Sequence, residues 1–313
     1  MIKKIYGQHT FYFAVLTIIL SIIALTVGGN VKLSNEFIIP LVCLFFILSI
    51  GISHGAMDNY KAKKLLAIYK VNNKSIFFIF YISISAFVIL LWSLFSSISL
   101  LLFLVVASYH FGREDTAFLN KGNSNLDQLF YLIKGSLIVF SPLFFHFDET
   151  LKIFETLFLS EKILIYLKDE HWIINVCLSL SILGYFYFVY KNKFEDYEIL
   201  FLDMLSILIL NYIFNPLVAF TIYFCFLHSI RHIISISWEL NSVNLLAGIK
   251  TFIKKSFPLT VITAILYLLA IFLLSNSYGL NDVIIKVIFI GLASLTFPHI
   301  LLEYLLEKNE KRN

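Results

Sequence analysis

The sequence predicts an all-α fold: a polytopic membrane helix bundle of about ten transmembrane helices, forming a single integral-membrane domain over residues 1–313. Hydrophobic residues make up 59% of the chain, and the mean hydropathy is +0.87. Only 14% of the residues are charged, whereas soluble domains carry about 25%. Apolar runs of about 20 residues, the length that crosses a bilayer, recur along the chain. These runs override the two soluble domains that length alone would suggest.

Ten apolar segments qualify as spans when the sequence is read in windows of about 19 residues. In chain order they lie near 10–28, 37–56, 76–94, 96–112, 128–147, 172–190, 199–214, 216–237, 257–276 and 283–305. The first run is long and lacks a clear small-residue cleavage site, so it is predicted to be a span rather than a signal peptide. The segment 151–168 alternates apolar with charged residues and is predicted to be an interfacial amphipathic helix.

The basic residues of the predicted loops orient the bundle. With ten spans, the two termini and the even-numbered loops share one side, which collects seventeen Lys and Arg residues. The other side has four, namely Lys32 and the three lysines of 151–168. Cytoplasmic loops carry such an excess, so both termini are predicted to be cytoplasmic in a multi-pass protein of the cell (inner) membrane. The net charge of +4 is small, and no nucleic-acid partner is expected.

Five of the eight histidines lie inside apolar segments of membrane length: His54, His110, His228, His232 and His299. A polar ring is costly in hydrocarbon unless it has a partner or a function. All five lie in the last part of even-numbered spans, which run in one direction, so the rings are predicted to share one depth in the cytoplasmic half of the bilayer. His228 and His232 are four residues apart, stack on one helix face and can bind the same ion.

This pattern predicts a metal site with nitrogen ligands. Neutral imidazole suits iron, zinc, copper and nickel, whereas calcium and magnesium prefer oxygen. His54 and His110 would complete a four-nitrogen set with His228 and His232, leaving positions open for dioxygen and substrate. The three cysteines form no CxxC, so a thiolate zinc site is not expected. Metal-bound histidines usually donate their second N–H to a carboxylate or a carbonyl group. The carboxylates near the same predicted depth are Asp58, Glu114, Asp203 and Glu303.

A more ordinary interpretation exists for each histidine taken alone. A lone membrane histidine is more often a hydrogen-bonding residue between helices than a ligand. The convergence of four or five of them at one depth is what favours a metal. His9, His146 and His171 lie at span ends or in loops, and they are expected to be surface histidines.

Three basic residues inside predicted spans need an explanation of their own. Arg231 lies between the paired histidines but faces elsewhere by helical spacing, so it is expected to snorkel or to pair with Asp203. Lys134 is expected to snorkel to the cytoplasmic interface. Lys286 invites comparison with a retinal Schiff-base lysine, but it lies near the outer end of the last span. Ten spans do not suit an opsin, so snorkelling is expected there as well.

Four short motifs resemble those of a known family. They are His54-Gly55-Ala56 with Asp58, His110-Phe111-Gly112 with Asp115, His228-Ser229 with Arg231-His232, and Pro298-His299. In this order over positions 51 to 304, they resemble the Brp/Blh family of membrane-bound β-carotene 15,15′-dioxygenases. The resemblance implies a non-haem Fe(II) enzyme that cleaves β-carotene at its central double bond with O₂ and gives two molecules of all-trans-retinal.

The resemblance also implies roles for individual residues. The catalytic residues and Fe(2+) ligands would be His54, His110, His228 and His232, with His299 as a fifth ligand, a support for a ligand or a pocket residue. The other candidates that support ligands or line the pocket are Asp58, Glu114, Asp115, Asp203, Glu303, Tyr109 and Tyr223. The partners implied are β-carotene, O₂, the lipid bilayer and a retinal-binding opsin that takes up the product. The 30 or so residues before the second span resemble an N-terminal extension without an assigned function.

The physics of the substrate agrees with this resemblance. β-Carotene is an apolar rod of about bilayer thickness that partitions into hydrocarbon. An enzyme that acts on it gains from a metal placed inside the membrane, where substrate arrives laterally between helices. Pockets for such ligands are lined by apolar and aromatic groups, and aromatic residues are frequent near the five histidines.

Three other functions remain open at the level of sequence. A membrane di-iron desaturase or hydroxylase needs about eight histidines in several boxes, and this chain has one HxxxH pair. A histidine-lined transporter for metal ions or protons should show polar or broken segments near the bilayer middle, often in repeated halves. A non-catalytic accessory protein for opsin assembly could retain the same ligands for structural reasons.

Overall fold

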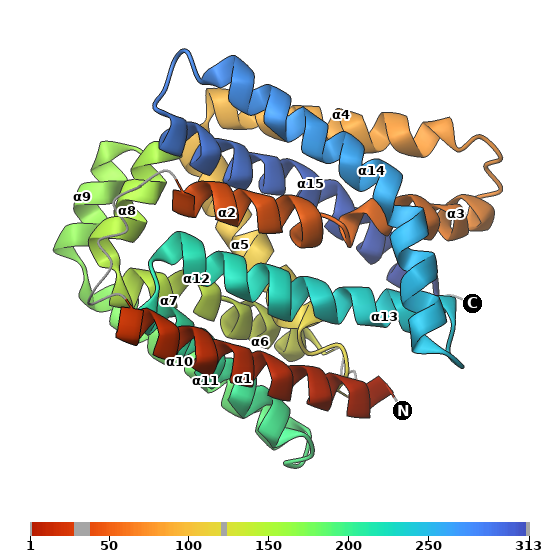
Figure 1. Cartoon of the computed structure of the whole chain (residues 1–313), viewed down its shortest axis with the longest axis horizontal. Helices are drawn as coiled ribbons and strands as arrows, with labels where there is room; N and C mark the ends of the chain where they lie inside the picture. Colours follow the sequence, from red (N-terminus) through yellow and green to blue (C-terminus); the bar gives the residue numbers. More distant parts are fainter. Residues whose placement is uncertain (1, 28–37, 120–123, 311–313) are drawn as a thin grey trace.

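A computed structural model describes residues 2–27, 38–119 and 124–310. Within these ranges every regular element is a helix, so the all-α prediction is confirmed (Figure 1). The predicted end of the first span at 28, the start of the second at 37, and Lys32, Lys121, Lys311 and Arg312 lie outside the described residues. The elements in chain order are α1 (Ile2–Val27), α2 (Ile38–Phe46), η1 (Ile47–Gly51), η2 (Gly55–Met57), α3 (Asp58–Ile68), α4 (Ser75–Leu94), α5 (Ser96–Glu114), α6 (Asn125–Gly135), α7 (Leu137–Phe145), α8 (Phe147–Thr156), α9 (Glu161–Asp169), α10 (Trp172–Lys191), α11 (Tyr197–Ile213), α12 (Pro216–Ile222), η3 (Tyr223–Ser229), α13 (Ile230–Leu240), α14 (Leu245–Leu274) and α15 (Leu280–Glu310).

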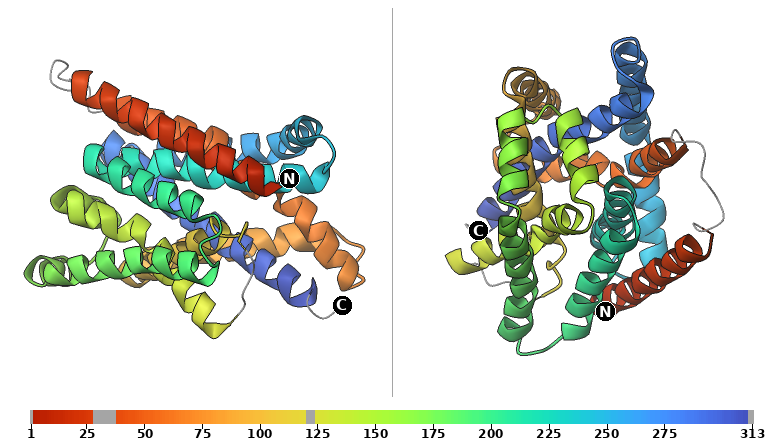
Figure 2. Two further views of the ribbon diagram at one scale, coloured as in Figure 1. Left: turned by 90° about the horizontal axis from the view of Figure 1, so that it is seen from below. Right: turned by 90° about the vertical axis from the view of Figure 1, so that its left-hand side faces the viewer.

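The described part of the chain contains nine helices that are long and apolar enough to cross a membrane. They correspond to nine of the ten predicted spans. The tenth, predicted near 199–214, is α11, whose 17 residues are about the shortest length that crosses a bilayer. Both described chain ends lie at the same end of the bundle (Figure 1 and Figure 2), as an even number of crossings requires.

Two of the predicted spans change their winding in the middle. In the second, α2 passes into the π-helical η1, a turn and the short 3₁₀ helix η2 before α3 begins. In the eighth, the π-helical η3 lies between α12 and α13. Such π-helical turns are rare and often mark functional sites. The two segments touch, because Ser229 donates a hydrogen bond of 3.3 Å to the carbonyl of Gly51. A β-carbon on Gly51 would lie 2.6 Å from the Phe224 ring, so only glycine allows this approach.

The approach of α5 to α6 also depends on glycine. A β-carbon on Gly112 would lie 1.8 Å from the carbonyl oxygen of Tyr131, and one on Gly135 would lie 1.8 Å from that of Ser108. No side chain larger than hydrogen fits at either position with the two backbones where they are. This contact fixes the position of α5 against α6 at Gly112, two residues after His110.

The segment 151–168 is not the one continuous helix that the sequence predicts. The segment forms α8 and α9, separated by a turn in which Phe158 has a positive φ of 68°. The turn buries Leu157, which is 1% exposed. Its backbone also satisfies donors from the α4–α5 region: the Leu157 carbonyl accepts from Trp92, and the Phe158 carbonyl accepts from Ser96. The alternation of charged and apolar residues could not show that this segment folds back to close one end of the bundle.

Candidate metal centre

The five membrane histidines are all buried and gather in one cluster. His54 lies in the turn after η1, His110 in α5, His228 in η3, His232 in α13 and His299 in α15. The ring centroid of His54 lies 5.6 Å from that of His228, 5.1 Å from His232 and 5.7 Å from His299. The His110 centroid lies 5.2 Å from both His228 and His299, and His232 lies 5.7 Å from His299. Four transmembrane segments therefore bring their imidazoles around one small volume.

Four of these rings form a closed loop. In the order His54, His228, His110 and His299, each ring neighbours the next at 5.2 to 5.7 Å, and His299 neighbours His54 again. His232 lies beside this loop, against His54 and His299. The four imidazoles of the loop come from four transmembrane segments, and His232 borders the loop.

A carboxylate orients His228. The Nδ1 atom of His228 lies 3.0 Å from Asp115 Oδ1, and the other oxygen of Asp115 accepts a 2.6 Å hydrogen bond from Tyr223. Burial alone would raise the pKa of Asp115, but the His228 ring, Lys134 and Arg231 hold that pKa well below its ordinary value. The charged carboxylate keeps the proton on Nδ1, which leaves the Nε2 lone pair free. Nε2 is buried and has no hydrogen-bond partner among the described residues.

His299 repeats this arrangement with a second carboxylate. Its Nδ1 atom lies 2.8 Å from Asp58 Oδ1, and Asp58 Oδ2 accepts a 3.0 Å hydrogen bond from Tyr81. The Nε2 atom of His299 is likewise buried without a hydrogen-bond partner in the described part of the chain, as is the Nδ1 atom of His54. Metal-binding histidines show this pattern, in which one ring nitrogen is held by a carboxylate and the other is left for the ion.

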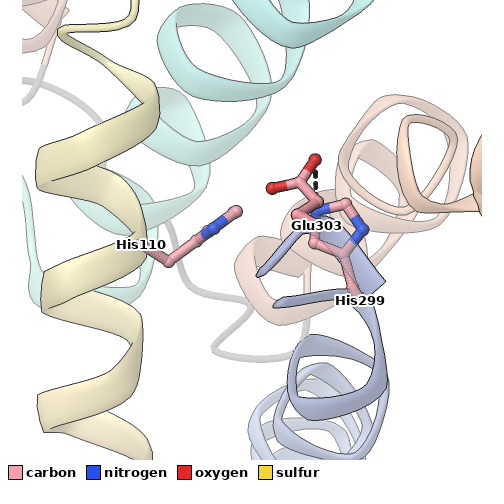
Figure 3. Close-up of side chains that lie close together, drawn as sticks. All are labelled: His110, His299 and Glu303. Atoms are coloured by element: carbon pink, nitrogen blue, oxygen red, sulfur yellow. Dashed lines mark ion pairs between the residues drawn. The ribbon is translucent and has the colours of Figure 1, made fainter. Parts of the chain in front are cut away.

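Glu303 adds an oxygen donor to the cluster. Figure 3 shows His110 from α5 facing His299 and Glu303 from α15. One ligand atom from each of the three lies within 4.8 Å of the others, and Glu303 Oε1 is 3.7 Å from His299 Nε2. A second trio with the same spacing consists of Glu114, His232 and Glu303.

Lys61 contacts two members of the second trio, His232 and Glu303. The sequence alone did not identify it as a site residue. Its Nζ atom lies 3.2 Å from His232 Nε2 and 2.5 Å from Glu303 Oε1. On the other side of the ring, His232 Nδ1 lies 3.5 Å from Glu114. Both nitrogens of His232 therefore have close polar neighbours, whereas Nε2 of His228 and Nε2 of His299 have no hydrogen-bond partner among the described residues, and the Glu303 carboxylate lies 3.7 Å from Nε2 of His299. The position of Lys61 on the first turn of α3, three residues after Asp58, could have indicated that it lies near the cluster.

The structure pairs the predicted carboxylates with different histidines than the helical spacing suggests. Asp58 contacts His299 instead of His54, which lies one turn before it. Glu114 contacts His232 instead of His110. In both cases the partner comes from another helix.

Tyr109 points away from the cluster. Its hydroxyl donates to Gln128 of α6 and accepts from Arg113 on its own helix. Tyr223, by contrast, supports His228 through Asp115.

Asp203 belongs to a separate network around Arg231. The two terminal nitrogens of Arg231 donate to the two oxygens of Asp203 at 2.8 and 3.0 Å. The same nitrogens donate to Thr10 at 2.8 Å and to the Asp115 carbonyl at 3.0 Å. Pairing with Asp203 is therefore the correct alternative for Arg231, and snorkelling is not. Since Thr10 is 1% exposed, α1 is packed into the core rather than appended to it.

Two further expectations about single residues are wrong. His9 is not a free surface histidine, because its Nε2 atom lies 2.9 Å from the Phe226 carbonyl and joins α1 to η3. Lys134 does not snorkel, because it is 2% exposed and its Nζ atom lies 4.5 Å above the Tyr185 ring. His146 and His171 are partly exposed and take no part in the histidine cluster.

An apolar cavity of about 950 Å³ extends from the cluster along the bundle. Its walls come mainly from α4, α14 and α15, and α15 packs against both of the others (Figure 1). His54, His110, His228 and His299 line the cavity, and His232 is not among its lining residues. The residues of the closed loop thus face the cavity, and cavities of this size bind small molecules.

The donor set fits a transition metal. His110, His299 and Glu303 each place a ligand atom within 4.8 Å of the others, and the neighbouring rings of His54 and His228 each have a buried nitrogen without a hydrogen-bond partner among the described residues. Nitrogen-rich sets of this kind suit iron, copper, zinc or nickel and do not suit calcium or magnesium.

Comparison with known proteins decides the family. The sequence model of the β-carotene 15,15′-dioxygenase family matches residues 45–307. The chain belongs to the β-carotene 15,15′-dioxygenase family. A β-carotene 15,15′-dioxygenase from the uncultured marine bacterium 66A03 is 26% identical over 278 residues, which cover 88% of this chain and 97% of that protein. No solved structure matches the chain. Membership of this dioxygenase family shows that the protein is an enzyme, in preference to a transporter or a non-catalytic accessory protein.

Proposed function

We propose that the protein cleaves β-carotene at its central 15,15′ double bond with O₂, giving two molecules of all-trans-retinal, with one Fe(II) ion as its cofactor. Each oxygen atom of O₂ becomes one aldehyde oxygen, so the reaction balances without a further reductant. The observation that carries the proposal is the set of buried, unpartnered imidazole nitrogens at the inner end of an apolar cavity.

For the ion itself, we propose His54, His110, His228 and His299 as nitrogen ligands. The set expected from sequence has His232 in place of His299. The geometry favours His299, because it faces the cavity and its Nε2 forms no hydrogen bond with any described residue, while His232 is held by Glu114 and Lys61. Fe(II) bound there would supply the activation of dioxygen, which protein side chains cannot provide. Asp115 and Asp58 hold the proton on Nδ1 of His228 and His299.

One ion agrees with the structure better than two. A second metal would need the trio of Glu114, His232 and Glu303, which lacks the nitrogen-rich surroundings of the first site. The ammonium group of Lys61 already balances the Glu303 carboxylate there. A di-iron centre of the desaturase type is therefore not proposed.

The cavity positions the polyene and excludes water. From His299 to Lys286 along α15 the distance is about 20 Å at a helical rise of 1.5 Å per residue. Half of a rod of bilayer thickness is about 15 Å long. One half of β-carotene therefore fits between the cluster and the outer end of the cavity, which places the central double bond beside the histidines. Access is lateral, between α4 and α14, which flank α15.

Orientation and partners follow from the same proposal. The distribution of loop lysines and arginines supports an inner-membrane location with the histidine cluster in the cytoplasmic half. Uptake of the product by a retinal-binding opsin stays a prediction.

Expression in bacteria that accumulate β-carotene tests the function. Loss of the orange colour together with a retinal peak supports central cleavage, and longer apocarotenals would show cleavage at another bond. Alanine at His54, His110, His228 or His299 should abolish retinal formation with the protein still inserted. His171→Ala, outside the cluster, is the matched control. Full turnover in His299→Ala together with loss in His232→Ala would restore the set expected from sequence.

A further inference from the structure

Helix α1 lies outside the part of the chain that matches the family, yet it packs behind the histidine cluster. The family model matches residues 45–307, and α1 covers Ile2–Val27. The helix, drawn in red in Figure 1, packs against α11, α13 and η3. His228 belongs to η3 and His232 to α13. A helix outside the family match therefore touches both elements that carry the paired histidines.

The first contact joins His9 to the π-helical turn. Its Nε2 atom lies 2.9 Å from the carbonyl oxygen of Phe226, two residues before His228. Because a carbonyl group only accepts hydrogen bonds, Nε2 of His9 is the donor. The Nδ1 atom of His9 is buried and has no hydrogen-bond partner among the described residues. The bond to Phe226 is therefore the one that orients this ring, and it ties α1 to the backbone of the turn that carries His228.

A second contact reaches His228 by a longer route. Thr10 accepts a 2.8 Å hydrogen bond from Arg231 and donates one of 3.2 Å to Asp203. The same guanidinium donates to the backbone carbonyl of Asp115 at 3.0 Å, and the Asp115 side chain holds Nδ1 of His228 at 3.0 Å. Two neighbouring residues of α1 thus act on His228, one through η3 and the other through Asp115.

The π-helical winding of η3 decides where His228 points. An α-helix turns by about 100° per residue, from its 3.6 residues per turn, and a π-helical turn takes up an extra residue. If η3 relaxed to α-helical winding, the residues before and after it would rotate by about 100° relative to each other. His228 and His232 would then no longer border the same volume. The hydrogen bond from His9 is made with the carbonyl where the π-helical winding places it, and it therefore stabilises that winding.

We propose that α1 is a positioning helix for the metal centre and that His9 is the positioning residue that holds η3, and with it His228, in the orientation that binds the ion. This inference rests on the role of His228 as a ligand in the proposed function. His9 does not line the cavity, so it acts through the backbone of η3.

Metal titration of point variants tests the inference. His9→Leu and His9→Phe remove the donor, whereas His9→Gln keeps an N–H group close to the place of Nε2. Gln8→Leu, at the exposed neighbouring position of α1, is the matched control. Each purified protein is titrated anaerobically with Fe(II) and with Co(II), whose visible spectrum reports the geometry of its ligands. Thermal unfolding without metal measures the purely structural contribution of His9.

The two variants without the donor should bind both ions about fivefold more weakly or worse, since one hydrogen bond has about this value, and their Co(II) spectra should change. His9→Gln should restore affinity and spectrum, and Gln8→Leu should match the wild type. Lower thermal stability with wild-type affinity and spectrum would overturn the inference, because His9 would then serve folding alone. Equal losses in His9→Gln and His9→Leu would overturn it as well.

Cleavage of β-carotene is assayed separately on the same proteins. A wild type that binds metal but forms no retinal would contradict the proposed function, and the affinity ratio between wild type and His9→Leu would still decide the role of His9. A wild type that cleaves β-carotene, with unchanged metal affinity in His9→Leu and His9→Phe, would overturn this inference and leave the proposed function intact.

Discussion

Two buried polar sites share one helix, and they differ in how far the protein supplies hydrogen-bond partners for their buried nitrogens. His228, Arg231 and His232 are 1%, 3% and 6% exposed on neighbouring turns of η3 and α13. Each terminal nitrogen of Arg231 has two acceptors, drawn from Asp203, Thr10 and the backbone. Nε2 of His228 has no hydrogen-bond partner in the described chain, although Nδ1 is held firmly by Asp115.

The difference separates a structural site from a binding site. Buried polar groups are nearly always hydrogen-bonded, so a group left without a partner needs an explanation. In the Arg231 network the protein supplies partners for both terminal nitrogens from its own side chains and backbone, and Nε of the guanidinium is the atom left without one among the described residues. In the histidine cluster the protein orients the rings of His228 and His299 through carboxylates and leaves their Nε2 atoms without a hydrogen-bond partner among the described residues, which is what a metal ion would provide.

Removing a ring of the closed loop should have the largest effect. In His110→Ala we expect no measurable turnover and no stabilisation by Fe(II). Wild-type protein at 100 times the dissociation constant should gain about 2.7 kcal/mol. Thermal unfolding in detergent with and without anaerobic Fe(II) measures the gain. Equal stabilisation of His110→Ala and wild type by iron would contradict the assignment of the histidine cluster as the metal-binding site.

Removing Arg231 should affect folding instead of metal binding. Arg231→Met leaves Asp203 as a buried charge without its partner, which typically costs about 3–5 kcal/mol of unfolding free energy. The double variant Arg231→Met/Asp203→Leu should recover most of this loss. Chemical unfolding measures the free energies, and iron binding by the folded fraction should persist. A variant that stays fully stable yet binds no iron would contradict the division between the two sites.

The carboxylates behind the ligands should have an intermediate effect. Asp115→Asn and Asp58→Asn keep the shape of the side chain but no longer fix the proton on Nδ1, so Fe(II) affinity should fall about 10- to 100-fold. Metal titration of each purified variant measures this. Asp148→Asn, at an exposed position of α8, is the control. Unchanged affinity in both variants would mean that these carboxylates only assist folding.

The smallest change in iron affinity is expected from substitutions of two tyrosines near the cluster. Tyr223→Phe removes the hydrogen bond to Asp115, worth about 1 kcal/mol, so iron affinity should fall by up to about fivefold. Tyr109→Phe removes contacts to Gln128 and Arg113, and iron affinity should stay as in wild type. The same titration distinguishes them, and the reverse order of effects would assign the supporting role to Tyr109.

The sequence predicts most of the fold and the membership of the site. Span lengths and loop charges depend on local composition, so nine spans and the shared end of the termini follow from counting. The convergence of five histidines follows from the common direction of even-numbered spans. Local composition and span direction do not predict which groups on different helices pair, such as Asp58 with His299 or Glu114 with His232.

The features that the sequence could not show arise from tertiary packing. Helical spacing places residues on a face but does not reveal the π-helical turns at η1 and η3, which set where His54 and His228 point. Lys61 and Lys286 look like ordinary interfacial lysines in the sequence. Only the folded chain shows that Lys61 meets Glu303 and that Lys286 lines the cavity, with its ammonium group over the rings of Phe158 and Tyr278.

The number of iron ions bound per chain distinguishes a single metal centre from none or two. Purified protein titrated anaerobically with Fe(II) and freed of excess ion should retain one iron per chain, and His54→Ala/His228→Ala should retain none. No iron retained by the wild type, or two ions per chain, would contradict a single centre built from imidazoles of four transmembrane segments.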